Sequence, residues 1–310
     1  MTKFTRILAL AMGVIAAGAA AARADTKVRL AYTATGGFLS SFVAADQGFF
    51  KKRGLDVEFQ LIGLNSNFPP AMVAGSTDIG GTTTTGLLQA VDAGIALVVV
   101  TGGAYTTKAS TTGTLVARVN GGIVKPADFV GRKIGVPGIG AILHVLTMNW
   151  LLENGVDPKK VTYVELGFLQ MKDALQNGLV DAVVTADPTF SQIVRAGIGV
   201  EVGRIYRALK TETQGIVYSA TAEWAASHAD AVRAFHEANA EAAAFVPAHD
   251  AESRAVLAKY LHLTPEVANA VELTTTKADV TAAELQEIID VMNRLGLLTT
   301  KIDPNKLLAP

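Results

Sequence analysis

The sequence predicts an α/β protein built from two similar units that face each other across a cleft. One observation is an internal echo in which seven positions recur 103 residues later (174 − 71) without a gap. The pairs are Ala71/Ala174, Gly75/Gly178, Asp78/Asp181, Ala93/Ala196, Gly94/Gly197, Ile95/Ile198 and Val99/Val202. The other is the alternation of strand-like and helix-like segments, which is typical of crossover units and mostly parallel sheets. This spacing, in a chain of 310 residues, favours two α/β units over a short-period solenoid.

Each element of the first unit has its own local signal. Apolar and polar residues alternate over Leu55–Leu61 with the period of a strand. Pro69 and Pro70 stand where proline opens a helix, and Gly75 stands where glycine closes one. In order, the signals predict a strand over 28–32, a helix that follows the turn at 36–37 and runs to 54, a strand over 55–61, a helix over 69–75, a strand from 78, a helix around 87–93 and a strand over 95–100.

The second unit is predicted to match the first segment for segment. Strands are expected over 133–136, 161–166 and 182–185, and helices over 141–153, 171–177 and 188–196. After a strand over 216–219 the pattern changes to helical periodicity over 224–246, 251–261 and 281–295, punctuated by Pro247, Pro265 and Gly296. We expect this tail to form helices that wrap one unit.

Residues 1–24 are predicted to be a cleaved secretory signal peptide. Lys3 and Arg6 precede an almost purely apolar stretch over 7–22, and Ala22-Arg23-Ala24 fits the small-x-small cleavage rule. A membrane anchor is the alternative, but the apolar stretch is short for about 30 Å of hydrocarbon. The mature chain would begin near Asp25, and the periplasm is the expected compartment.

Composition narrows the classes of function. Residues 1–24 hold three of the 27 basic residues and no acidic one, so the remainder has 24 basic and 28 acidic residues, a net charge of −4. A basic patch for nucleic acid or a membrane surface is therefore not expected. The lack of cysteine excludes disulfides, thiolate metal sites, a cysteine nucleophile and a lipid anchor on cysteine. We expect a free, monomeric protein.

Two lobes joined by two chain crossings are expected. Residues 25–112 together with 215–310 would form the first lobe, and residues 113–214 the second. The stretches 110–114 and 211–215 lie between the units and are rich in small and hydroxyl residues, so we interpret them as a hinge. The alternative is that both are ordinary surface loops.

Four turns form the candidate binding site, because ligands of open α/β sheets bind beyond the carboxyl ends of strands, beside helix N-termini. Backbone N–H groups and the positive helix end favour anionic or strongly polar groups there. The 103-residue offset maps Thr84 onto Asp187, so a hydroxyl would face a carboxylate. The candidate contacts are Thr33, Thr35, Gly36, Gly37, Phe38, Phe68, Thr82, Thr83, Thr84, Gly138, Ile139, Gly140, Ala141 and Asp187. Helix capping is the alternative for residues 82–85 and for Asp187, and core packing is the alternative for Phe68.

Signals for catalysis, cofactors or metals are weak. Gly135-x-x-Gly138-x-Gly140 lies between a strand and a helix, but its spacing differs from the dinucleotide-binding Gly-x-Gly-x-x-Gly. None of the five histidines has metal-ligand spacing with a carboxylate, and the chain contains neither Gly-x-Ser-x-Gly nor a P-loop. We therefore predict no enzyme activity, no cofactor and no bound metal.

Four runs of residues carry a resemblance to a known family. They are 44–57 (AADQGFFKKRGLDV), 75–80 (GSTDIG), 131–137 (GRKIGVP) and 175–188, which contains Leu-x-x-Gly-x-x-Asp-Ala and then Asp-Pro. They resemble solute-binding proteins of ABC importers in the nitrate/sulfonate/taurine class, which also includes binders of thiamine pyrimidine precursors. The resemblance implies a type II periplasmic-binding-protein fold with a ligand cleft between two lobes, each a mostly parallel sheet flanked by helices.

The resemblance also implies a function. The chain would capture a small polar organic molecule in the periplasm by Venus-flytrap closure and deliver it to an ABC permease and ATPase complex at the inner membrane. No arginine lies in the four turns, which argues against a doubly charged anion, and Asp187 suits a ligand with an N–H, amine or hydroxyl donor. A sulfonate, a carboxylate or a nitrogen heterocycle remains open. The alternatives are an exported enzyme related to thiamine pyrimidine biosynthesis proteins and a ligand-sensing subunit of a membrane receptor.

Overall fold

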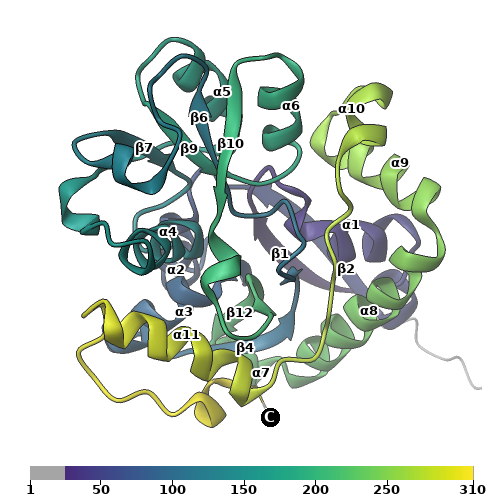
Figure 1. The fold of residues 1–310 in the computed structure, drawn as a ribbon. Coiled ribbons are helices and arrows are strands. Elements are labelled where there is room, and N and C mark those ends of the chain that lie inside the picture. Colours follow the sequence, from purple (N-terminus) through teal and green to yellow (C-terminus); the bar gives the residue numbers. More distant parts are fainter. Residues whose placement is uncertain (1–24, 310) are drawn as a thin grey trace, which may run out of the picture.

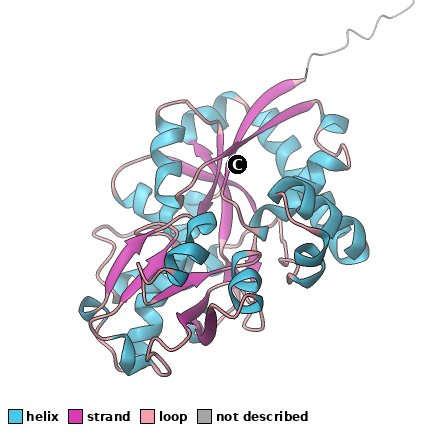
Figure 2. Cartoon of the chain, turned by 90° about the horizontal axis from the view of Figure 1, so that it is seen from above, coloured by secondary structure: helices cyan, strands magenta, loops and turns pink. Residues whose placement is uncertain are grey.

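Two five-stranded sheets, each flanked by helices, form the molecule (Figure 1). The computed structural model describes residues 25–309, and the predicted signal peptide, residues 1–24, lies outside this range. The view from above in Figure 2 shows the strands in two groups with helices around both. The predicted α/β class with mostly parallel sheets is confirmed.

The first sheet has the strand order β2-β1-β3-β12-β4. Its members are β1 (Thr26–Tyr32), β2 (Leu55–Leu61), β3 (Ile79–Thr83), β4 (Leu97–Gly102) and β12 (Ile216–Thr221). β1 pairs in parallel with β2 and β3, whereas β12 is antiparallel to β3 and β4. Every residue of the central β3 is buried, as expected for a strand covered on both faces.

The second sheet repeats this topology. Its members are β6 (Thr114–Arg118), β7 (Lys133–Val136), β8 (Thr162–Glu165), β9 (Ala182–Thr185) and β10 (Gly199–Arg204). Read from β8, the order β8-β7-β9-β6-β10 reproduces that of the first sheet, with the antiparallel strand again in fourth place. The internal echo therefore marks two units of one topology. β6 and β10 are not among the strands predicted from the sequence.

The chain crosses between the sheets twice, and each crossing ends in the antiparallel strand of the other sheet. The first crossing leads from β4 to β6, and the second leads from β10 to β12. β5 (Tyr105–Thr106) in the first crossing pairs with β11 (Thr213–Gln214) in the second. Arg204 Nη1 also donates a hydrogen bond to Ala109 O at 2.8 Å. The two crossings are thus joined to each other as well as to both sheets.

Apart from shifted ends, the helices differ from the sequence prediction at three places, one of which is the unpredicted α10 (Pro265–Ala270). The predicted helix over 224–246 is two helices, because the chain leaves helical geometry at His228, where φ is −126°. The helix expected to run to Gly54 ends at Asp46, and a turn with a short 3-10 helix follows. The α-helices of the described residues are α1 (Leu39–Asp46), α2 (Phe68–Val73), α3 (Thr84–Asp92), α4 (Ile142–Glu153), α5 (Phe168–Gln176), α6 (Thr189–Arg195), α7 (Ala222–Ser227), α8 (Ala229–Ala248), α9 (Asp250–Leu261), α10 (Pro265–Ala270) and α11 (Ala282–Arg294).

The C-terminal helices contact both sheets. α8 and α9 pack on α1 beside the first sheet. Leu285 and Ile288 of α11 instead share a buried apolar cluster with β7, β9 and α4. Arg294 Nη2 donates to Asn149 Oδ1 in α4 at 2.6 Å. The assignment of residues 215–310 to the first lobe therefore stays a prediction. In residues 25–309, no helix combines the length and apolar character that a membrane span requires.

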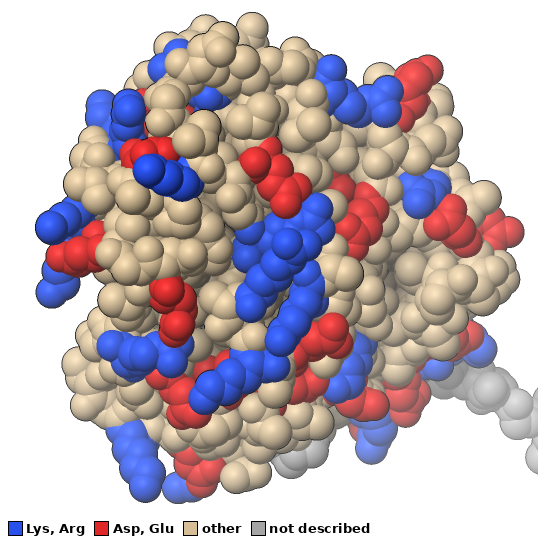
Figure 3. Space-filling model, in the orientation of Figure 1, with Lys and Arg blue, Asp and Glu red and all other residues tan. Residues whose placement is uncertain are grey.

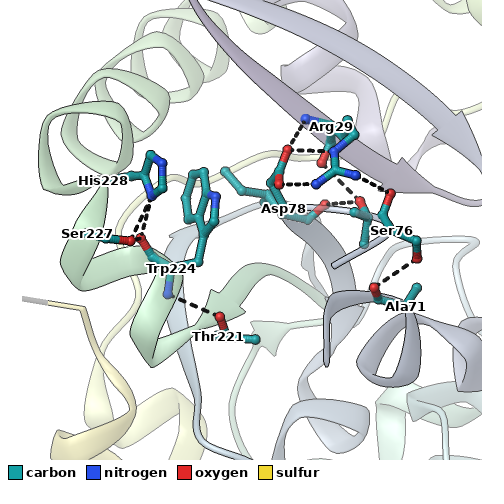
Figure 4. A network of polar contacts seen from close by, with 10 residues as sticks. Arg29, Ala71, Ser76, Asp78, Thr221, Trp224, Ser227 and His228 are labelled. Atoms are coloured by element: carbon teal, nitrogen blue, oxygen red, sulfur yellow. Dashed lines mark hydrogen bonds and ion pairs between the residues drawn. The ribbon is translucent and has the colours of Figure 1, made fainter. Parts of the chain in front are cut away.

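The repeated aspartates anchor equivalent strands in the two units. Asp78 N–H donates to Arg29 O at 3.0 Å, and Asp78 Oδ2 accepts from Arg29 N–H at 2.8 Å. Asp181 exchanges the same two bonds with Lys133, each at 2.9 Å. Figure 4 shows the Arg29 guanidinium on the Asp78 carboxylate, with Nη2 2.6 Å from Oδ1. The repeated glycines all have φ between +65° and +85°, which glycine adopts without strain: Gly75, Gly94, Gly178 and Gly197.

Asp78→Asn is expected to destabilise the fold more than Asp181→Asn. Burial alone would raise the pKa of Asp78, but hydrogen bonds from Arg29 hold it below its ordinary value. Asp181 has a more distant guanidinium, since Arg132 Nη1 lies 3.7 Å from its Oδ1. Urea unfolding at pH 7 should show a loss of about 2 kcal/mol for Asp78→Asn and about 1 kcal/mol for Asp181→Asn. Equal losses would contradict this account of the echo.

Candidate ligand-binding site

A cavity lies where the two sheets face each other. The enclosed space is about 30 Å³, room for about one or two water molecules, so a larger ligand would require the two sheets to move apart. The cavity walls come from the turns after β1, β2 and β9, the end of β3, the two crossings and the first turns of α4 and α5. The lining residues are Thr33, Thr35, Gly37, Asn65, Thr83, Ala104, Thr106, Thr112, Ile142, Leu143, Phe168, Ala186, Tyr206, Gly215 and Ile216.

Three hydroxyl groups in this cavity have no hydrogen-bond partner within residues 25–309. They are Thr33 Oγ1, Thr106 Oγ1 and Tyr206 OH. Their residues are only 1, 2 and 3% exposed, respectively. A buried polar group left without a partner costs about 1–3 kcal/mol, and native proteins keep such groups rare. Seven other buried side-chain atoms in the described residues also lack a partner, but these three are the ones that line the cavity.

The second crossing holds Tyr206 in the cavity. Tyr206 lies in η6 (Ile205–Ala208), directly after β10, and Gly113 packs so closely on its ring that a Cβ there would come within 2.7 Å. Burial raises the pKa of Tyr206, and the neighbouring Thr106 hydroxyl offsets only part of this rise. These two hydroxyls do not meet in hydrogen-bonding geometry. Tyr206 therefore stays protonated and can both donate and accept a hydrogen bond.

The cavity walls are uncharged. Among the described residues that line the cavity, none is Asp, Glu, His, Lys or Arg. Figure 3 shows charged side chains spread over the outer surface, with basic ones gathered in the middle of that face. Inside, polarity comes from hydroxyls, from the Asn65 amide and from the N-termini of α3 and α4, where Thr83 and Ile142 stand. The part of the chain from 25 to 309 also contains no group of three acidic or histidine side chains that could hold a metal.

Eight of the fourteen predicted contacts lie along the cleft. Thr33, Thr35, Gly37 and Thr83 line the cavity itself. Ile139, Gly140 and Ala141 line a second hollow at the cleft mouth, and Gly138 lies against the backbone of Ser66. The Gln89 side chain fills the space that a Cβ at Gly140 would need, and Gly140 has a φ of +80°. Glycine is therefore required where this turn meets α3.

The two predicted aromatic contacts belong to the core. Phe38 packs edge to face on Tyr218 with ring centroids 6.1 Å apart, and a Cβ at Gly81 would fall 2.0 Å from its ring. Phe68 is fully buried in the same apolar cluster, as the alternative interpretation had it. Neither ring lines the cavity, so the structure places both predicted aromatic contacts away from it.

Thr82 and Thr84 connect protein segments and do not line the cavity. Thr82 Oγ1 lies 2.8 Å from Ser219 Oγ in the neighbouring β12. Thr84 Oγ1 donates to Gln214 O in the second crossing at 2.5 Å. The Thr82 hydroxyl therefore joins β3 to β12, and the Thr84 hydroxyl joins α3 to the second crossing.

Asp187 and Gly36 lie beside the cavity and bind each other. Asp187 O accepts hydrogen bonds from Gly36 N–H at 3.1 Å and from the Thr35 hydroxyl at 3.2 Å. Its carboxylate accepts from the Ser191 hydroxyl in α6 at 2.6 Å and from Glu272 N–H at 2.9 Å. Ser191 N–H in the first turn of α6 also donates to this carboxylate at 3.1 Å, as the capping alternative implies, and the carboxylate is not among the lining groups.

Several lining residues are not among the contacts predicted from the sequence. Thr106 and Tyr206 lie on the crossings, a few residues from the predicted hinge stretches, and the richness in hydroxyl residues there was a usable signal. Asn65 and Phe168 carry no such signal, because a lone asparagine or phenylalanine near a helix start is ordinary. Folding alone brings these four to one place.

Comparisons with known proteins extend this picture. A family model described as "NMT1/THI5 like" matches residues 36–253. No curated protein matches the chain.

Several solved structures are similar in fold. The alkanesulfonate-binding protein SsuA from Xanthomonas axonopodis pv. citri, bound to MOPS, has a TM-score of 0.78 at 19% identity, over 93% of this chain and 99% of that chain. The periplasmic aliphatic sulphonate-binding protein SsuA from Escherichia coli has a TM-score of 0.72 at 22% identity, over 92% and 98%. The periplasmic nitrate-binding protein NrtA from Synechocystis PCC 6803 has a TM-score of 0.75 at 15% identity, over 90% and 84%. The fold is thus that of periplasmic binding proteins.

His144 is expected to make the fold sensitive to acid. Its buried ring accepts Gly140 N–H through Nδ1 at 3.0 Å, and burial lowers its pKa to about 4, although Glu165 acts in the opposite direction. An unfolded histidine has a pKa near 6.5, so the unfolded chain binds the proton first as pH falls. The free energy of unfolding should therefore be fully present above about pH 6.5 and decline by about 3 kcal/mol towards pH 4.

Urea unfolding between pH 7 and pH 4.5 tests this dependence. His144→Phe removes the titrating ring, so its stability should fall less steeply with acid than that of the wild type. Parallel pH profiles for the two proteins would show that His144 does not cause the decline.

Proposed function

Because the chain belongs to the NMT1/THI5-like family, we propose that it is a solute-binding protein that encloses one small organic molecule between its two sheets. The observation that carries this proposal is the set of three buried hydroxyls, Thr33, Thr106 and Tyr206, without protein partners in one cavity. Binding explains them, because ligand atoms would replace the missing hydrogen bonds. The lining holds no carboxylate, imidazole, amine or thiol in the described chain, which favours binding over turnover.

The cavity favours a ligand with one polar head and an apolar body. The head would hydrogen-bond to the three free hydroxyls, and the body would pack against Leu143 and Phe168. The N-termini of α3 and α4 favour a single negative charge or a strong dipole. A second negative charge finds no cation in the lining, and an ammonium group finds no open carboxylate, since protein donors occupy that of Asp187. A sulfonate, which has one charge and three acceptor oxygens, fits this chemistry. Two of the similar structures are named as sulfonate-binding proteins, which supports this choice.

We further propose that the protein works in the periplasm and passes its ligand to an ABC permease and ATPase complex. Residues 25–112 and 215–310 would move as one lobe and residues 113–214 as the other. The hinge would be the two crossings near 110–114 and 211–215, where the chain forms the small β5–β11 pair. The fold shared with periplasmic binding proteins supports this proposal.

Tyr206→Phe is expected to weaken ligand binding without destabilising the fold. The substitution removes a hydroxyl that has no protein partner, so the free energy of unfolding of the ligand-free protein should stay within about 0.5 kcal/mol. The lost hydrogen bond to ligand should lower affinity about tenfold, equal to about 1.4 kcal/mol. Native mass spectrometry of the purified protein, and then a thermal-shift screen of alkanesulfonates, carboxylates, their amides and nitrate, identify a ligand. Calorimetry with that ligand measures the affinities of the wild type and the variant.

Tyr163→Phe is the matched control. Its hydroxyl donates to Pro158 O in the second unit and does not line the cavity. Affinity should be unchanged in this variant. Equal affinities in wild type and Tyr206→Phe would remove Tyr206 from the site, and turnover of a retained compound would favour an enzyme.

A further inference from the structure

Asp187 connects the second sheet to the first at the edge of the cavity. It follows β9, and its backbone oxygen accepts from Gly36 N–H at 3.1 Å and from Thr35 Oγ1 at 3.2 Å, both in the turn after β1. Its Oδ2 accepts from Glu272 N–H at 2.9 Å and from Thr111 Oγ1 at 3.2 Å. One residue thus accepts four hydrogen bonds from segments outside the second sheet.

The Asp187 carboxylate has no capacity left for a ligand. Its Oδ1 accepts from Ser191 N–H at 3.1 Å and from the Ser191 hydroxyl at 2.6 Å. Its Oδ2 holds Glu272 and Thr111. A carboxylate offers about four lone-pair sites, and all are used in a side chain whose residue is 6% exposed. The role of Asp187 follows from the segments that it joins.

Glu272 belongs to an extended segment, residues 271–281, which we call the strap. The strap runs from α10 to α11 across the face seen in Figure 1. Tyr105 N–H in the first crossing donates to Thr275 O at 2.8 Å. At the upper end of the strap, Glu272 Oε2 accepts from Thr111 N–H at 2.8 Å. The strap is therefore fixed to the first crossing along its length, and its Glu272 end reaches the second lobe through Asp187.

Other hydrogen bonds within the chain join the two sheets at the opposite side of the cavity. Asn65 N–H in the turn after β2 donates to Pro137 O after β7 at 3.0 Å. Thr85 Oγ1 in α3 donates to Gly140 O before α4 at 2.8 Å. Both sides of the cleft are thus joined by groups of the protein itself.

We propose that Asp187 is a latch that holds the two lobes closed through the strap, and that it is a positioning residue and not a ligand contact. This inference rests on the proposed function, in which closure retains the solute. Because the latch consists of hydrogen bonds between two parts of the same chain, it stabilises the closed form before a ligand binds. Weakening the latch therefore opens the ligand-free molecule and speeds the exchange of solute.

Hydrogen exchange of the ligand-free, full mature chain tests the latch directly. Asp187→Asn keeps the shape of the side chain but turns one acceptor oxygen into a donor, which must face either Ser191 or the Glu272 and Thr111 donors. Ser191→Ala is the matched control, because it removes the hydrogen bond from the Ser191 hydroxyl in α6 to Asp187 and leaves the strap bonds in place. The amides of Gly36 and Glu272 are the reporters, since both donate to Asp187 in the closed form.

The latch predicts slow exchange of both amides in the wild type and in Ser191→Ala. In Asp187→Asn the Glu272 amide should exchange at least tenfold faster, and small-angle scattering should show a larger radius of gyration. Unprotected amides in the wild type, or equal acceleration in both variants, would overturn the latch. The experiment uses no solute, so its failure is separate from failure to find a ligand, which would count against the proposed function.

Discussion

The double passage of the chain between the two sheets is the constraint on which the cavity depends. Each crossing must enter the other sheet as an antiparallel strand, β6 or β12, so both run past the ends of the parallel strands. Thr106 and Tyr206 lie on these passages and are carried into the cavity with them. Any movement of one sheet against the other must bend the segments that bear these hydroxyls. Ligand contact and lobe movement are therefore linked by the covalent path of the chain.

The absence of charged side chains from the lining of the described cavity shapes its chemistry. A buried cation or anion would demand a partner and would reject ligands of like charge strongly. Hydroxyls, an amide and helix N-termini instead supply oriented hydrogen-bonding groups and partial charges without a full charge. Two buried titratable residues near the cavity, Asp187 and His144, both accept hydrogen bonds from the protein's own backbone. Selectivity then depends on shape and on hydrogen bonds.

Much of the fold follows from local signals in the sequence, and much of the site does not. The parallel strands and their helices were predictable because hydrophobic period, proline and glycine act within a few residues. The repeated Asp78 and Asp181 bind the backbones of equivalent strands in the two units. β6 and β10 were missed because pairing with distant strands defines them. The four candidate turns lie along the cavity and its neighbouring hollow, but which side chain of a turn faces the cavity depends on tertiary packing. Phe38 turned into the core for that reason, while Tyr206 was brought in from afar.

A crystal structure of the protein with the compound that it retains on purification tests the central claim most directly. The account predicts that this compound lies between the sheets, with polar atoms within hydrogen-bond distance of the hydroxyls of Thr33, Thr106 and Tyr206. A compound bound elsewhere, or a closed cleft in which these three hydroxyls remain without partners, would contradict it.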